Sequence, residues 1–159
     1  GDGSLPMVTP PESAKLMVER ILKGVYKAGK KPAQFDICGC AWFSISPSGK
    51  GTKTDTLKDI LAYFGHYMDE DALATVGLSQ AHFAGTQRLV DAGDYDGARA
   101  AVTPEMMKLA VVGSPKDAIA QIEMLAEAGV TQVSIGGPLG PDPKEAIRLF
   151  GEQVIPYFR

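Results

Sequence analysis

Cysteine, histidine and tryptophan are scarce in this chain. Its 159 residues include two cysteines, two histidines and one tryptophan. Cys38 and Cys40 are two residues apart in a strand-like run, so both side chains should point to one face of that strand. Such close neighbours on an extended backbone bridge poorly, and no second cysteine pair completes a zinc site. We expect two reduced core thiols, which fits a cytoplasmic location.

Metal, nucleic-acid and membrane functions are disfavoured by other absences. His66 and His82 are far apart in the sequence, and neither belongs to a His-x-x-His pattern. The net charge is −3 and no basic stripe is present, so nucleic acid is not an expected partner. The longest apolar runs, such as residues 109–112, are too short to span a membrane. No signal peptide is visible, and because the first residue is Gly1 we expect the natural start to be absent or removed.

The composition is that of a globular domain, with 45% hydrophobic and 22% charged residues. Hydrophobic periodicity and turn residues divide the chain into alternating strands and helices. Residues 55–107 contain no convincing strand and form a helical insert, and residues 46–54 form a solvated loop. The predicted strands are 35–45, 108–113 and 131–136, and the predicted helices outside the insert are 10–28, 115–128 and 143–150. This alternation predicts an α/β fold with parallel strands.

Three predicted helices begin in the same way. Thr9, Ser114 and Asp142 each supply a capping oxygen, a proline follows, and an acid occupies the third helical position. The repeated start indicates related βα units, as in a barrel. A closed (β/α)₈ barrel needs eight strands and typically about 250 residues, whereas three strong strands are visible. The sheet is therefore either small and open or part of a larger barrel.

Two loops that follow predicted strands could hold an anion or a ligand. Gly113 and Ser114 offer backbone N–H groups at a helix start, although Asp117 already meets that helix end. Gly136 and Gly137 would let a ligand approach the backbone closely. The structural alternatives are helix capping at the first loop and turn formation at the second. Neither loop matches a mononucleotide or dinucleotide phosphate-binding motif.

The remaining polar and aromatic groups favour structural roles. Residues 69–71 form an acidic cluster that is best explained by helix capping or solvation. Lys50 and Lys53 could touch an acidic ligand, although a solvated loop explains them as well. Residues 42–43 (Trp-Phe) are expected in the core, with stacking on a ring cofactor as the alternative. No nucleophile–base pair with a recognisable spacing is present.

Four segments together resemble a known family. They are residues 1–3 (GDG), 114–117 (SPKD), 125–133 (LAEAGVTQV) and 145–158 (EAIRLFGEQVIPYF). The chain resembles the C-terminal half of the luciferase-like superfamily, and within it the coenzyme F420-dependent methylenetetrahydromethanopterin reductases. The resemblance implies one partial barrel domain over residues 1–159, with the helical insert at about 55–107. It also implies a deazaflavin bound at the barrel mouth, and hydride transfer from reduced F420 to a pterin-type one-carbon carrier in methanogenesis.

The resemblance also suggests where the cofactor lies. Met7, Val8 and Thr9 would face the substrate or cofactor side, and Gly136 and Gly137 form the second candidate contact. The N-terminal half of such a protein would supply the first strands and the acidic residues near the reacting atoms. We therefore expect the isolated chain to be inactive, and to bind a complementary half or itself. The alternatives are a noncatalytic α/β module for a ligand or partner, and a fragment of an FMN-dependent monooxygenase.

Overall fold

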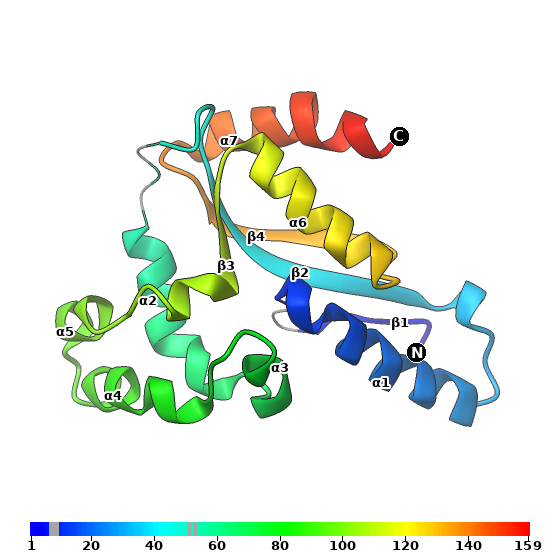
Figure 1. Ribbon diagram of the computed structural model, residues 1–159, viewed down its shortest axis with the longest axis horizontal. Helices are drawn as coiled ribbons and strands as arrows, with labels where there is room; N and C mark the ends of the chain where they lie inside the picture. The colour runs from blue at the N-terminus through cyan, green and yellow to red at the C-terminus, as the bar shows by residue number, and fades with distance from the viewer. Residues whose placement is uncertain (7–9, 51, 53) are drawn as a thin grey trace.

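A parallel sheet built around one long strand organises the chain (Figure 1). The computed structural model describes residues 1–6, 10–50, 52 and 54–159. The strands are β1 (Gly3–Ser4), β2 (Asp36–Ile45), β3 (Ala110–Gly113) and β4 (Gln132–Leu139), and β1, β3 and β4 each pair with β2 in parallel. The three predicted strands and their parallel direction are confirmed. The short strand β1 was not predicted, because two residues carry no periodic signal.

The strand order places β2 in the middle of the sheet. Trp42 is paired with Ala110 of β3 on one side and with Gly136 of β4 on the other. Consecutive strands of a closed barrel are neighbours, and β2 and β3 follow that rule. No pairing between β3 and β4 occurs within the described ranges, because the four residues of β3 reach only the last part of β2 and β4 runs along its opposite edge.

One face of the sheet is covered by the helices that connect and follow the strands (Figure 1). These helices are α1 (Ala14–Lys27), which follows the 3₁₀ turn Pro11–Ser13, then α6 (Pro115–Glu127) and α7 (Pro143–Leu149). A π-helical turn (Phe150–Val154) and a 3₁₀ turn (Ile155–Phe158) end the chain. Phe43 is fully buried on this face and meets Phe150 edge to face at 5.3 Å between ring centroids. The predicted helices outside the insert are confirmed.

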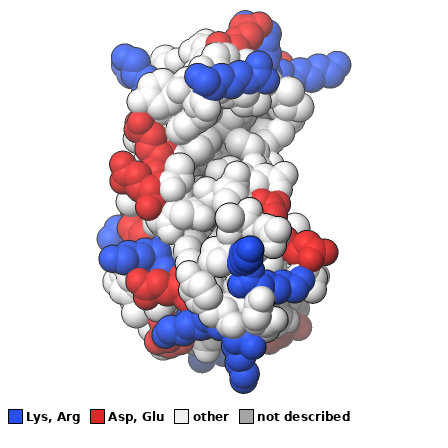
Figure 2. All heavy atoms as spheres, turned by 90° about the vertical axis from the view of Figure 1, so that its right-hand side faces the viewer, with Lys and Arg blue, Asp and Glu red and all other residues white. Residues whose placement is uncertain are grey.

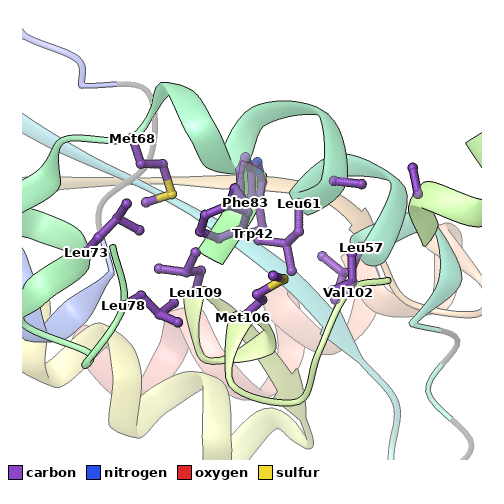
Figure 3. Packing of buried hydrophobic residues seen from close by; sticks show 12 residues of the cluster. Trp42, Leu57, Leu61, Met68, Leu73, Leu78, Phe83, Val102, Met106 and Leu109 are labelled. Carbon is purple, nitrogen blue, oxygen red and sulfur yellow. The ribbon is translucent and has the colours of Figure 1, made fainter. Parts of the chain in front are cut away.

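The opposite face of the sheet packs against the helical insert. The insert contains α2 (Asp55–Phe64), α3 (Glu70–Ala74), α4 (Gln80–Asp91) and α5 (Tyr95–Ala100), and a 3₁₀ turn at Gly65–Tyr67. A second 3₁₀ turn, Met106–Leu109, leads from the insert into β3. A third, Pro32–Gln34, lies outside the insert and precedes β2. Figure 3 shows Trp42 among Leu61, Phe83 and Leu109 in the core of the insert. Trp42 and Phe43 therefore lie on opposite faces of β2, as alternation along a strand requires. Both have the core role expected from the sequence.

The helix starts show why their sequences are capped. Ser114 and Asp117 form a reciprocal capping box at α6, and the Asp142 side chain accepts hydrogen bonds from the backbone N–H groups of Lys144 and Glu145 at α7. The third predicted cap, Thr9, lies outside the described residues. Gly129 ends α6 with a φ of +99°, a conformation that favours glycine.

The acidic cluster at residues 69–71 has a structural role. The Asp69 side chain accepts the backbone N–H of Ala72 at 3.0 Å and so caps α3, as predicted. This hydrogen bond is the first cause that holds the pKa of Asp69 below the ordinary range of an aspartate. Arg20 of α1 pairs with both Asp69 and Asp71, which ties the insert to the remainder of the chain. That ion pair was not predicted, because the sequence does not show which helices become neighbours.

Both cysteines are free thiols on the face of β2 that carries Trp42. Cys38 is buried, as predicted for a core thiol, whereas Cys40 is only half-buried. Burial is the main cause that raises the pKa of the Cys40 thiol, while a hydrogen bond with Ser134 opposes it. None of the described helices has the length and apolar character needed to cross a bilayer.

Candidate functional site

The carboxyl ends of β2, β3 and β4 meet at one edge of the sheet. Ile45 is paired with Gly113, and Ser44 is paired with Leu139. The backbone N–H of Ser46 also donates to the Gly113 carbonyl at 3.0 Å. The predicted loop at Gly113 and Ser114 leaves this edge. Gly136 and Gly137, which were predicted as a loop, lie instead in the last part of β4, because the strand continues to Leu139. Ligands of parallel α/β proteins bind at this kind of edge.

The first loop is engaged by its own helix cap. The Ser114 backbone N–H and hydroxyl both donate to Asp117 Oδ2 at 2.7 Å. The backbone hydrogen bond from Ser114 is the leading cause that lowers the pKa of the Asp117 carboxyl. An added side chain at Gly113 would collide with the same carboxylate. Capping explains Gly113 and Ser114, and an anion at this helix start would face the negative charge of Asp117.

The second candidate segment, residues 136–140 at the end of β4, contains three glycines with different surroundings. A Cβ atom at Gly136 would lie 2.9 Å from the Ala41 carbonyl oxygen and 3.0 Å from Trp42 Cδ1. A Cβ atom at Gly140 would collide with the Ile45 carbonyl oxygen. Gly137, by contrast, is exposed and has no neighbouring atom within 4 Å of that position. Packing thus explains Gly136 and Gly140, whereas the open space beside Gly137 is available to a ligand.

The same segment, residues 136–140, contains a strained backbone conformation. Leu139 has a φ of +72°, in the left-handed region of backbone conformation that residues other than glycine rarely adopt. Gly137 lies outside that region, so a turn with positive φ does not explain its presence. Bulky residues held in sparsely populated conformations cluster at functional sites, because the surrounding structure must stabilise them. Strain at Leu139 and open space at Gly137 together make residues 136–140 the stronger of the two candidate segments.

The third candidate segment cannot be placed in the same way. Met7, Val8 and Thr9 lie outside the described residues, as does Lys53. The neighbouring residues Ser4 and Pro6 line a cavity of about 230 Å³ between β1, α1 and α3. The role suggested for residues 7–9 remains a prediction.

A larger cleft lies beside β3, and sequence reasoning missed it. Its volume is about 510 Å³, within the range of small-molecule sites. Ala110 and Val112 of β3 contribute to its wall on the face of the sheet that also carries Trp42. No signal in the sequence indicates the cleft, because its residues come from two segments, 54–58 and 102–112, that are about 50 positions apart in the chain and meet only in the fold. The lining residues are Thr54, Lys58, Val102, Thr103, Pro104, Met107, Lys108, Ala110 and Val112.

An apolar groove runs along β4 on the opposite face of the sheet. Its volume is about 460 Å³, and its lining comes from α6, β4 and the C-terminal turns. Figure 2 shows a broad uncharged band, hollowed across the middle of the molecule, on the side where the C-terminal turns and α1 lie. The apolar residues of the groove are Ile122, Ala126, Val130, Val133, Ile135, Phe150, Val154, Ile155 and Phe158. Apolar grooves beside a sheet edge are typical of surfaces that another segment covers.

Comparisons with known proteins agree on one family. The sequence profile of the luciferase-like monooxygenases matches residues 1–132. The chain is 34% identical to the 5,10-methylenetetrahydromethanopterin reductase of Archaeoglobus fulgidus, over 98% of the chain and 48% of that protein. It is 30% identical to the enzyme of the same name from Methanolobus tindarius, over 97% of the chain and 48% of the relative. The chain therefore spans about half the length of the curated relatives that it matches.

Solved structures give the same result. The coenzyme F420-dependent tetrahydromethanopterin reductase of Methanopyrus kandleri superimposes with a TM-score of 0.87 and 28% identity, over 100% of this chain and 46% of that one. An F420-dependent secondary alcohol dehydrogenase, solved with an F420–acetone adduct, superimposes with a TM-score of 0.60 over 96% of this chain. Its 20% identity indicates a shared fold alone.

Proposed function

Because the chain belongs to the luciferase-like monooxygenase family, we propose that it is the C-terminal half of an F420-dependent oxidoreductase. The proposed reaction is hydride transfer from reduced F420 to methylenetetrahydromethanopterin. The superposition of the whole chain on half of an F420-dependent reductase, with a TM-score of 0.87, carries this proposal. The relatives named as methylenetetrahydromethanopterin reductases support the choice of substrate.

The residues at the sheet edge fit a large planar cofactor. Gly137 is exposed, and apart from its two neighbours in the chain no residue has an atom within 4 Å of the position that a Cβ would occupy. A ring could therefore approach the backbone at Gly137 without meeting a side chain. Gly136 is locked against Trp42 and the Ala41 carbonyl, so the backbone next to Gly137 is held firmly. Residues 136 and 137 would hold the cofactor, with Met7, Val8 and Thr9 as the further contacts that the family resemblance suggests.

In this proposal the chain positions its ligands. F420, when bound, supplies the hydride chemistry, and the protein contributes binding and orientation. Asp117 is unsuited to proton transfer, because its carboxylate is engaged by two hydrogen bonds at Ser114 and its pKa is lowered. The buried Cys38 and the raised pKa of Cys40 likewise disfavour a thiolate nucleophile. We therefore propose that the acid and base groups of the active enzyme come from the complementary half.

The complementary half has a surface on which to dock. The outer edge of β4 lies beside the apolar groove, and an unpaired edge readily accepts a further strand. Docking there would extend the sheet toward a closed barrel and cover the exposed side chains of Ile155 and Phe158. The coverage of about half of each relative supports this assignment of the partner.

Cofactor binding tests the proposal. The chain, with and without the N-terminal half of the A. fulgidus reductase, is dialysed against F420 and against FMN, and the retained chromophore is measured. We expect the paired halves to retain F420 in preference to FMN. Preferential retention of FMN would contradict the F420 assignment and favour a monooxygenase. Retention of neither cofactor by properly associated halves would favour a noncatalytic α/β module.

A further inference from the structure

The cleft beside β3 combines an apolar wall with two cationic side chains. Val102 is buried and belongs to the core of the insert shown in Figure 3, and Ala110 and Val112 continue this apolar surface along β3. Lys58 comes from the first turn of α2, and Lys108 comes from the 3₁₀ turn before β3. These two lysines line the same cavity of about 510 Å³.

Neither of these lysines is neutralised by a direct ion pair in the part of the chain that the structure describes. No carboxylate is among the described residues that line the cleft. Three acids lie nearby in the sequence, Asp55 and Asp59 beside Lys58 and Glu105 beside Lys108. Asp59 makes two hydrogen bonds with Arg99, at 2.6 and 3.1 Å, and the charge of Asp55 also acts on Arg99. The Glu105 carboxyl is hydrogen-bonded to Thr103, and the charge of Lys108 acts on it less strongly than this hydrogen bond. The cleft therefore presents net positive charge next to an apolar wall.

This chemistry identifies a class of ligand. A cavity of this size with an apolar wall suits an aromatic or aliphatic body, and a few polar groups fix its orientation. Two ammonium groups suit an oxyanion, which they attract and to which they donate hydrogen bonds. We propose that the cleft binds a small organic anion with an apolar body, whose carboxylate or phosphate group is held by Lys58 and Lys108. This site is distinct from Gly136 and Gly137, and its existence does not depend on F420 being the cofactor.

The proposal is tested with two fluorescent probes that share an aromatic body. 8-Anilinonaphthalene-1-sulfonate carries an anionic group, and N-phenyl-1-naphthylamine is its neutral counterpart. Binding is titrated with the full-length protein and with Lys58→Ala and Lys108→Ala. We expect each substitution to raise the Kd of the anionic probe about two- to fivefold, the range of exposed ion pairs, and to leave the neutral probe unaffected. Lys23→Ala, which removes an exposed lysine of α1 outside the cleft, is the matched control and should change neither Kd.

Further measurements locate the probe and guard against misfolding. Circular dichroism and melting temperature establish that each variant is folded. Ala126→Glu places a charge in the groove along β4, so a loss of probe binding in this variant alone would overturn the proposal. An unchanged Kd of the anionic probe in both cleft variants would also overturn it. Displacement of the probe by 1-naphthoate or by 1-naphthyl phosphate supports the site and identifies the preferred oxyanion, whereas displacement by neither contradicts it.

Discussion

Adding one methyl group at Gly136 should destabilise the protein, whereas adding it at Gly137 should not. The new Cβ of Gly136→Ala would lie 2.9 Å from the Ala41 carbonyl oxygen and 3.0 Å from Trp42 Cδ1. Ala41 belongs to the central strand β2, which is paired on both sides, so a shift of its backbone would cost free energy. Overpacking of this kind costs about 1–3 kcal/mol. The corresponding fall in melting temperature is about 2–4 °C for each kcal/mol in a chain of this size.

Trp42 gives this prediction a built-in probe. It is the only tryptophan, it is 8% exposed, and it contacts the site of the substitution. Urea unfolding followed by tryptophan fluorescence therefore measures the stability of Gly136→Ala and of its matched control, Gly137→Ala. The control should stay within about 0.5 kcal/mol of the wild type, because its Cβ meets open space and its φ is not left-handed. Equal losses in the two variants would refute this account of the loop.

Four further results are expected. Gly137→Val in the complete enzyme should weaken F420 binding, measured by fluorescence titration, with little change in melting temperature; the reverse would remove this residue from the site. Asp117→Asn should lower the free energy of unfolding in urea by about 1 kcal/mol at neutral pH. Because the folded-state pKa of Asp117 is lowered, the stability difference between wild type and variant should shrink as the pH falls below about 4. A stability difference that stays constant with pH would contradict the capping role of Asp117. A double-mutant cycle on Arg99 and Asp59 should give a coupling of no more than about 1 kcal/mol, since both side chains are over one-third exposed. Trp42→Ala should cost about 3–5 kcal/mol, measured by circular dichroism, and a loss below 1 kcal/mol would deny its core role.

Local chemistry explains which parts of the fold could be predicted from the sequence. The cap at Ser114 depends on neighbours within a few residues, and it has the predicted role. The run of aromatic and aliphatic residues at 35–45 also made β2 recognisable, and nearly the whole strand is buried. The position of β4 beside β2 was beyond such reasoning, because it depends on pairing between segments about 90 residues apart.

The candidate site was predicted only in part. The glycines at 136 and 137 were identified from the sequence, although it did not distinguish the packed Gly136 from the open Gly137. The positive φ of Leu139 was also hidden, since leucine gives no sequence signal for that conformation. Nothing in the sequence singles out Lys58 or Lys108. They line one cleft because α2 and the turn before β3 pack together, which is a property of the tertiary structure.

Reconstitution of the enzyme from two halves tests the central claim most directly. The chain is mixed with the N-terminal half of the A. fulgidus reductase, and oxidation of reduced F420 is followed by absorbance with methylenetetrahydromethanopterin as acceptor. The account predicts turnover by the paired halves and none by the chain alone. The account would be contradicted by turnover at about 1 per second or more by the chain alone. It would also be contradicted by a folded complex of the two halves that binds reduced F420 but does not oxidise it.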